Sequence, residues 1–196
     1  MSKILSDEGL DLLFREARTH SHWRDGEVGD VLLEAIYDLA KMAPTSANCS
    51  PMRVVFARSP AAKARLRPAL AEGNVDKTMA APVTAIIGYD TRFHEHLPRL
   101  FPHTDARAWF VGNEALIQET AFRNGSLQGA YFMLAARALG LDCGPMSGFD
   151  NAVVDQAFFP DGRVKSNFLC NLAHGDPRQL RPRAPRFEFA DACRIE

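Results

Sequence analysis

Apolar residues recur at helical spacing in several parts of the chain. Ser6 offers a hydroxyl N-cap and is followed by two acids, so we expect a first helix to begin there. A second helix is predicted from about Asp30 and must end near Pro44, because proline disfavours helical geometry in the residue before it. Ser59-Pro60 predicts a third helix with proline at its first position. The apolar positions of these helices are Leu10, Leu13, Phe14 and Ala17, then Val31, Leu32, Ala35, Ile36 and Leu39, then Leu66 and Leu70.

The longest helical pattern runs from about Asn113 to Leu139, and Gly140 after it is a natural C-cap. Gly125 and Gly129 stand inside this pattern, where each costs helix stability relative to alanine. Either they occur by chance, or another backbone or a flat ligand approaches the helix closely there. The predicted stripe is Ile117, Ala121, Asn124, Leu127, Tyr131, Leu134 and Ala138.

Strands alternate irregularly with these helices. The expected strands are residues 53–58, 83–89 and 166–173, and residues 141–149 predict a short strand or loop before a helix that Asp150 caps. Few strands and one dominant long helix predict an α+β fold rather than a regular βαβ alternation.

Composition bounds the class of protein. The chain has 196 residues, 46% hydrophobic and 24% charged, with a net charge of -1, which predicts a single domain over residues 1–196. The near-neutral balance argues against a dedicated nucleic-acid or anionic-membrane binder. The four cysteines form no CxxC pair, and no apolar signal core or membrane-spanning stretch is present, so we expect a soluble cytoplasmic protein. Residues 91–112 predict a partly helical excursion or lid, and residues 176–196 a basic tail.

Residues 43–51 form a loop of short polar side chains between two prolines. An ordinary turn has this composition. The same groups could equally hold a flat polar ligand by its edge. The loop at residues 144–150 offers the same choice, because its two glycines would permit a ligand to approach closely, whereas Asp150 could simply cap a helix.

Two basic clusters lie at opposite ends of the chain, one around Arg18 and one around Arg181. Each could be a solvated face, or together they could clamp a phosphate through charge-assisted bonds. No glycine-rich phosphate motif is present, so a phosphate site would be built from arginines. The histidine pairs at residues 20/22 and 94/96 have no acid or cysteine set at ligand spacing, and we predict no metal site.

Five motifs in this order resemble the FMN-dependent nitroreductase family over essentially the whole chain. They are Arg18-Thr19-His20-Ser21-His22, Pro44 to Asn48, Asn74-x-x-Lys77, Gly144 to Asp150, and Arg181-x-Arg183-x-Pro185. The second and fourth look most similar to the malonic semialdehyde reductase branch, associated with pyrimidine degradation. The resemblance implies a nitroreductase-like three-layer fold, with a small, mostly antiparallel sheet flanked by helices.

The resemblance also implies a homodimer with FMN at its interface, and the long helix as the main dimer contact. The residues expected at FMN are Arg18, Thr19 and His20 at the phosphate and ribityl chain, His22 beside the flavin, Asn74 and Lys77 along its pyrimidine edge, Pro145, Ser147 and Gly148 near N5, and Arg181 and Arg183 at the phosphate. Pro44, Thr45, Ser46 and Asn48 would come from the partner subunit.

Two positions depart from the family's pattern. Members often carry a lysine where His22 stands and an acid where Ser147 stands. Losing the cation should lower the flavin's reduction potential, or make it pH-sensitive if His22 titrates. Losing the acid changes the polarity where substrate meets N5.

The expected activity is two-step hydride transfer from NAD(P)H through FMN to a small acceptor, with no catalytic side chain assigned. The acceptor expected from the resemblance is malonic semialdehyde, reduced to 3-hydroxypropionate. Its carboxylate needs a cation, for which His103, Arg107 and Arg123 are candidates.

Two alternatives stay open. One is a broad nitroarene or quinone reductase in which Phe101, Trp109 and Phe110 form an adaptable lid. The other is a non-catalytic flavin-binding protein. No dinucleotide fingerprint distinguishes NADH from NADPH.

Overall fold

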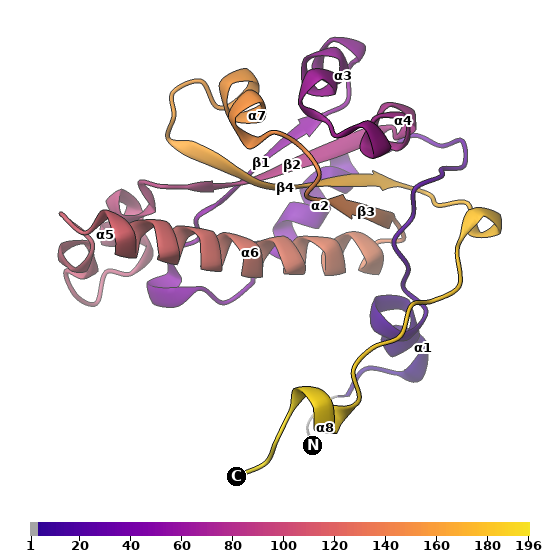
Figure 1. Cartoon of the computed structure of the whole chain (residues 1–196). Helices are drawn as coiled ribbons and strands as arrows, with labels where there is room; N and C mark the ends of the chain where they lie inside the picture. Colours follow the sequence, from indigo (N-terminus) through magenta and orange to yellow (C-terminus); the bar gives the residue numbers. More distant parts are fainter. Residues whose placement is uncertain (1–3) are drawn as a thin grey trace.

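A four-stranded antiparallel sheet forms the centre of this computed structural model, which describes residues 4–196. The strands are β1 (Met52–Ala57), β2 (Val83–Asp90), β3 (Asp142–Met146) and β4 (Val164–Ala173), and the helices are α1 (Asp7–Leu10), α2 (Asp30–Ala40), α3 (Pro60–Leu66), α4 (Glu72–Ala80), α5 (Leu97–Leu100), α6 (Glu114–Ala138), α7 (Asn151–Phe158) and α8 (Phe189–Ala192). The strand order is β1-β2-β4-β3. Helices α2 and α6 cover one face, and α3, α4 and α7 lie on the other (Figure 1). The predicted α+β fold of three layers is confirmed.

Helix boundaries follow the capping signals of the sequence. The hydroxyl of Ser59 accepts a hydrogen bond from the third residue of α3, and Asp150 Oδ1 accepts two backbone N–H groups of α7. Gly140 has a φ of +85° just after α6, a left-handed geometry that glycine adopts without strain. Ser6 caps α1, which continues as a π-helical turn over Asp11–Arg15. These predicted boundaries are confirmed.

The buried face of α2 differs from the predicted stripe. Val31 and Leu39 are exposed, whereas Leu33, Ile36 and Ala40 are buried against the sheet. This helix has more apolar residues than one face can bury, so periodicity alone did not identify which of them are buried.

The buried face of α6 also differs from the prediction. Leu127 and Tyr131 are exposed, and the core side instead includes Gln128 and Phe132. Gln128 Oε1 accepts the N–H of Met52 at 2.9 Å, so a polar side chain is buried because it pairs with the backbone.

The two glycines of α6 make room for the chain's own sheet. A Cβ on Gly125 would lie 2.9 Å from Tyr89 Cβ, and one on Gly129 would lie 2.6 Å from the ring of Phe168. Close approach is therefore the correct alternative for these glycines, and β2 and β4 are what approaches. They face the sheet rather than a partner subunit.

Helix α4 is not predicted by the local sequence pattern, and the third predicted helix, α3, is shorter than expected. Helix α3 ends at Leu66, and Leu70 lies beyond it in an isolated bridge with Phe149. Helix α4 contains Gly73, Asn74 and Thr78, which are poor helix formers, so its local sequence carries a weak signal. Hydrogen bonds from Trp23, Lys63 and Asn171 to backbone oxygens of its last turn stabilise α4.

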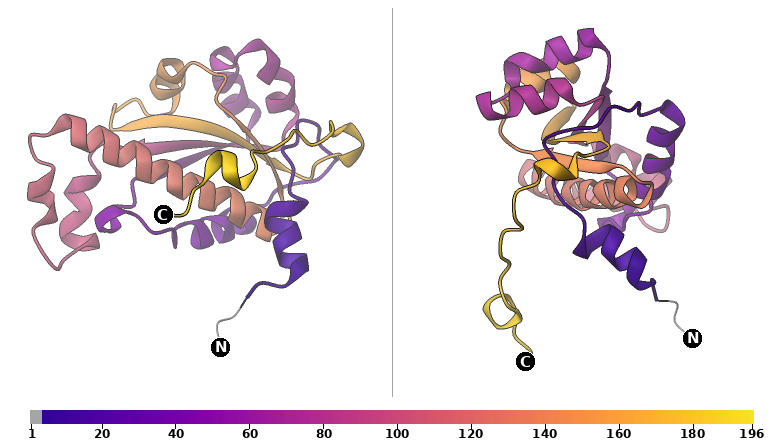
Figure 2. Two further views of the ribbon diagram at one scale, coloured as in Figure 1. Left: turned by 60° about the horizontal axis from the view of Figure 1, so that its bottom comes forward. Right: turned by 90° about the vertical axis from the view of Figure 1, so that its right-hand side faces the viewer.

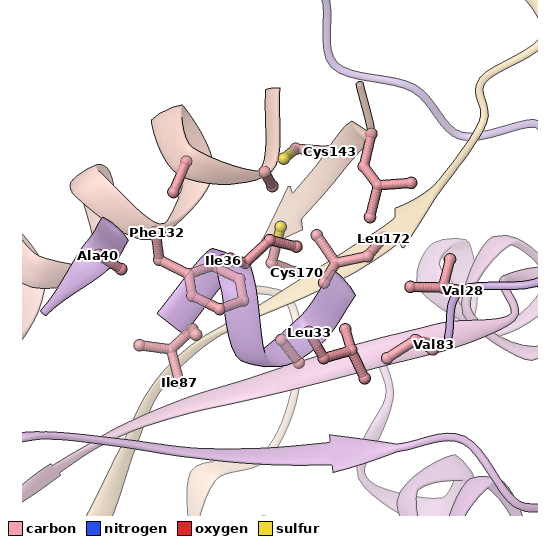
Figure 3. Close-up of a cluster of buried hydrophobic side chains, with 14 of the residues drawn as sticks. Val28, Leu33, Ile36, Ala40, Val83, Ile87, Phe132, Cys143, Cys170 and Leu172 are labelled. Carbon is pink, nitrogen blue, oxygen red and sulfur yellow. The ribbon is translucent and has the colours of Figure 1, made fainter. Parts of the chain in front are cut away.

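The main core lies between the sheet and the pair α2 and α6 (Figure 3). Ile36, Phe132 and Leu172 are fully buried there. Cys143 and Cys170 contribute to it from neighbouring strands as free thiols. A second core lies under α3 and α7 on the opposite face of the sheet.

Residues 91–112 are more helical than expected and pack into a third apolar cluster with the loop before β1. The rings of Phe93 and Phe110 meet edge to face with centroids 4.9 Å apart. Phe110 is buried in this cluster, so it cannot form the surface of a lid.

The C-terminal tail leaves the body of the molecule after about residue 180 (Figures 1 and 2). Phe187, Phe189 and Ile195 in this segment are exposed. No helix within residues 4–196 is both long and apolar enough to cross a membrane.

Candidate functional site

The segment of residues 18–24 runs along the free edge of β3 and onto the chain that follows β4. His20 N donates to Cys143 O at 3.0 Å, and Arg24 N donates to His174 O at 2.8 Å. Asp176 N in turn donates to His22 O at 2.9 Å. An edge strand has unpaired backbone groups, and this segment satisfies part of them. It is thereby fixed at one end of the sheet.

The two basic clusters of the sequence meet beside this segment. The guanidinium of Arg18 donates to the carbonyl of Arg181, and that of Arg183 donates to the carbonyls of Arg15 and Ala17 at 2.7 and 3.0 Å. Within residues 4–196, no carboxylate forms an ion pair with Arg18, Arg181 or Arg183. Their charges therefore remain available to an anion such as a phosphate.

A cavity of about 500 Å³ lies between this segment and α4. Its lining includes His22, Trp23, Gly73, Asp76, Lys77 and Gln179. Trp23 Nε1 donates to Lys77 O at 2.8 Å and so joins the two walls. Burial lowers the pKa of Lys77 from its ordinary value.

The loop after β3 reaches the first turn of α4. Asn74 Nδ2 donates to Gly148 O at 2.7 Å, and a Cβ on Gly148 would lie only 2.5 Å from that nitrogen. A larger residue at position 148 would therefore displace the Asn74 amide from this contact. Among the described residues, the N–H groups of Ser147 and Gly148 have no hydrogen-bond acceptor. They are free to donate to a ligand, and Pro145 before them lies in β3 opposite Cys170.

His20 differs from its neighbours because its ring is buried. Its Nε2 lies 3.5 Å from Asp142 Oδ1, and the ring covers Gly175 so closely that a Cβ there would meet Nδ1 at 2.0 Å. This packing makes the ring part of the scaffold. His22 is exposed and lines the cavity.

The loop of residues 44–50 has a defined shape. Ser46 N donates to Asn124 Oδ1 at 2.8 Å, and Asn48 Nδ2 donates to Leu100 O at 2.8 Å. Ala47 and Asn48 have φ angles of 48° and 50°, a left-handed geometry that costs energy in residues other than glycine. Thr45 Oγ1 accepts the N–H of Ser50 at 3.1 Å. The loop is therefore held by specific contacts from α6 and residues 91–112.

Within a single chain, the loop of residues 44–50 lies far from the cavity beside α4. The loop precedes Met52, which pairs with Tyr89, whereas Lys77 precedes Val83 at the opposite end of β2. Six residue steps of extended strand separate Tyr89 from Val83, which is roughly 20 Å. The loop, exposed Pro44 included, stands apart from the arginines and α4.

The three candidates for substrate recognition also lie on the far side, and they differ from one another. Arg123 is already paired with Glu119 along α6. Arg107 is exposed and, in the part of the chain that is described, forms no ion pair. His103 packs edge to face on Phe101 at 5.5 Å.

Trp23 lies at the cavity although no motif in the sequence singled it out. A tryptophan inside a basic cluster was a usable signal, because an indole N–H that is partly buried requires an acceptor. Among residues 4–196, no three or more His, Cys, Asp or Glu side chains are grouped so that they could hold a metal ion.

The family model and the similar sequences point to the same protein family. Residues 15–166 match the model of the nitroreductase family. A Burkholderia lata protein is 67% identical over 98% of both chains, and a Polynucleobacter asymbioticus protein is 60% identical over 100% of both. Both are named "Putative NADH dehydrogenase/NAD(P)H nitroreductase".

Solved structures show the same fold at low identity. An Exiguobacterium sibiricum protein, described as a "putative nitroreductase in complex with FMN", has a TM-score of 0.85 and 17% identity, covering 100% of both chains. A nitroreductase family protein from Streptococcus pneumoniae has a TM-score of 0.82 and 20% identity, covering 94% of this chain and 98% of that one.

Proposed function

This chain belongs to the nitroreductase family, and we propose that it is an FMN-dependent NAD(P)H oxidoreductase. The observation that carries the proposal is the convergence of three features at one end of the sheet. They are the arginine patch, the cavity wall of Trp23 and Lys77, and the free N–H groups of Ser147 and Gly148. A phosphorylated, flat, hydrogen-bonding ligand such as FMN needs all three.

Each feature has a role in this proposal. Arg18, Arg181 and Arg183 hold the phosphate by charge-assisted hydrogen bonds. The ammonium of Lys77 stabilises negative charge at the pyrimidine edge of the flavin. This stabilisation is strongest when water is excluded from the site. Ser147 or Gly148 donates its N–H to the flavin N5. When bound, FMN supplies hydride transfer from NAD(P)H to the acceptor.

We propose that the site is completed in a homodimer. The loop of Thr45, Ser46 and Asn48 is held by hydrogen bonds roughly 20 Å from the cavity of its own chain, which supports a role at the site of another subunit. Leu127 and Tyr131, exposed residues on one side of α6, offer a surface for such a contact.

The C-terminal tail supports the same assembly. It carries exposed aromatic residues and several arginines away from its own body. A groove of about 1030 Å³ beside the edge strand β1 contains Asp30, Glu34 and Asp38 of α2. Arginine and lysine side chains line the same groove, so its apolar residues Leu33, Val54 and Phe56 would receive the exposed aromatic residues of a tail exchanged between two copies.

For the acceptor, we propose malonic semialdehyde, reduced to 3-hydroxypropionate. Arg107 supports this choice, since an exposed guanidinium without an acidic partner can receive the carboxylate. In the dimer, Arg107 would approach the partner's flavin together with the loop of residues 44–50, which packs in the same cluster.

A second candidate is a broad nitroarene or quinone reductase. The observation that favours it is the ring of Trp109, which is 53% exposed beside Phe101. An exposed aromatic pair suits stacking on flat neutral acceptors. The names of the relatives favour this candidate also.

The decisive experiment is anaerobic reduction of the FMN-loaded protein by NADH and by NADPH, followed by a panel of acceptors. Bleaching of the flavin and reoxidation by malonic semialdehyde are expected. Reoxidation by quinones and nitroarenes alone selects the second candidate. A bound flavin that neither nucleotide bleaches would make the protein a non-catalytic flavin binder.

Mixed dimers test the assembly. One variant carries Arg18→Ala and Arg183→Ala, and the other carries Ser46→Ala and Asn48→Ala. Neither should bind FMN well alone, whereas a refolded mixture should regain one intact site per mixed dimer. A monomer that binds FMN in sedimentation experiments would overturn the proposal.

A further inference from the structure

Lys63 of α3 is a buried lysine with no acidic partner. It is 4% exposed, and its ammonium donates to Thr78 O and to Thr84 Oγ1, each at 2.7 Å. Within residues 4–196 no carboxylate forms an ion pair with it. A lone buried ammonium is expensive, so its two hydrogen bonds must hold it in one position.

The second of these bonds continues through the sheet to the candidate cavity. Since Thr84 Oγ1 accepts from Lys63, its own hydrogen goes to Asn171 Oδ1 at 2.7 Å. Asn171 Nδ2 then donates to Lys77 O at 3.3 Å, the same oxygen that accepts from Trp23 Nε1. Thr84 and Asn171 are both fully buried.

The first bond ends on the same helical turn. Thr78 and Lys77 lie in the last turn of α4. The carbonyl oxygens of a last turn accept no hydrogen bond from an N–H group of the same helix. This end of a helix carries partial negative charge, which a cation stabilises. Lys63 therefore contacts the last turn of α4 directly through Thr78 O and indirectly through Lys77 O.

We propose that Lys63 is a positioning residue for the flavin site. From α3, it holds the last turn of α4 and so fixes the wall that Lys77 and Trp23 present to the cavity. The inference rests on the proposed function for its ligand. The anchoring of α4 itself is a property of the protein without FMN.

The test uses Lys63→Met, which replaces the aliphatic stem by an unbranched apolar chain of similar length and removes the ammonium that donates both hydrogen bonds. Trp109→Phe provides the background, so that Trp23 is the remaining tryptophan and its emission reports its hydrogen bond in the protein without FMN. Lys63→Met should shift this emission and weaken FMN binding by about tenfold. Val154→Ala is the matched control, because this fully buried residue lies in the second core outside the network.

A double-mutant cycle with Trp23→Phe locates the effect. The two substitutions should weaken FMN binding by less than the product of their separate effects, because both act on the last turn of α4. If Lys63→Met does not fold, Thr84→Val cuts the link to Asn171 and should produce the same emission shift with a smaller loss of affinity.

Two results would overturn the inference. One is unchanged Trp23 emission and FMN affinity in the folded Lys63→Met or Thr84→Val protein. The other is an equal change in Val154→Ala, which would make the effect one of general stability. If the unsubstituted protein binds no FMN, the proposed function fails, whereas the emission measurements still decide the role of Lys63.

Discussion

Trp23 Nε1 donates a hydrogen bond of 2.8 Å to the backbone oxygen of Lys77, although the two residues are 54 positions apart. The bond satisfies an indole N–H and a helix-terminal carbonyl at once. It also joins the N-terminal segment to α4, so that the cavity has two walls fixed relative to each other. The consequences of this bond and of other contacts can be measured.

Trp23→Phe should weaken FMN binding roughly threefold to tenfold, because an aromatic ring remains at this position while the hydrogen bond is lost. Titration of the protein without FMN, followed by flavin fluorescence, measures the change. Val154→Ala is the control, since this fully buried side chain lies in the second core and does not line the cavity. Equal affinity of the Trp23→Phe and unsubstituted proteins would refute the role of this bond.

Gly129→Ala should destabilise the protein by about 1–3 kcal/mol through overpacking against Phe168. This loss outweighs the gain of up to about 1 kcal/mol in helix propensity. Gly73→Ala in α4 has nothing within 4 Å of the new Cβ and should be neutral or stabilising. Urea unfolding of both variants provides the comparison, and a stabilised Gly129→Ala would contradict the packing described.

Asp90 should make the fold sensitive to acid. Burial alone would raise the pKa of this carboxyl, but hydrogen bonds from Arg163 and from the N–H of Arg92, with the charge of Arg53, bring it below its ordinary value. The pKa of this carboxyl is lower in the folded protein than in the unfolded chain, where it is about 4. The carboxylate therefore stabilises the fold at pH values above about 4, and this stabilisation is lost as the pH falls from there through the folded-state pKa.

Asp90→Asn should therefore lower the free energy of unfolding at pH 7 by about 3 kcal/mol and flatten its decline below pH 4. Urea unfolding between pH 3 and pH 7 measures both. An unchanged acid dependence would show that other carboxyl groups dominate it.

Lys63 should produce a rise in stability at alkaline pH. Burial lowers the pKa of Lys63 from 10.5 to about 8, so the native state releases this proton at a lower pH than the unfolded state. The unfolded state then binds more protons, and the free energy of unfolding rises between these two values. Lys63→Met should lose this rise, whereas Lys165→Met, at a half-exposed lysine, should keep it. A rise that persists in Lys63→Met would assign it to another group.

Arg107→Ala should raise the KM for malonic semialdehyde about tenfold and leave that for a neutral quinone nearly unchanged. The reason is that only the first acceptor carries a carboxylate. Arg123→Ala is a suitable control because that side chain already pairs with Glu119. Steady-state kinetics with both acceptors measure the ratio, and equal effects on the two would exclude Arg107 from carboxylate recognition.

The candidate site was predictable to the extent that its residues lie in local motifs. The basic clusters at Arg18 and Arg181 and the loop at Gly148 were identifiable from their composition, and the structure brings them to one end of the sheet. Trp23 and Lys63 were missed because their importance comes from partners more than ten residues away in the sequence. The buried ring of His20 likewise depends on Gly175, which no local pattern connects to it.

By itself, the sequence determined where most elements begin and end, because caps and turns act over a few residues. Ser59, Asp150 and Gly140 mark boundaries by hydrogen bonds or backbone geometry that their own neighbours complete. Only the tertiary structure decided which face of α6 is buried, since Gly125 and Gly129 accept strands that are distant in sequence. The same holds for α4, whose weak helical sequence is stabilised at its end by Trp23, Lys63 and Asn171. Packing and buried hydrogen bonds join residues without regard to sequence distance, and periodicity within one segment cannot report them.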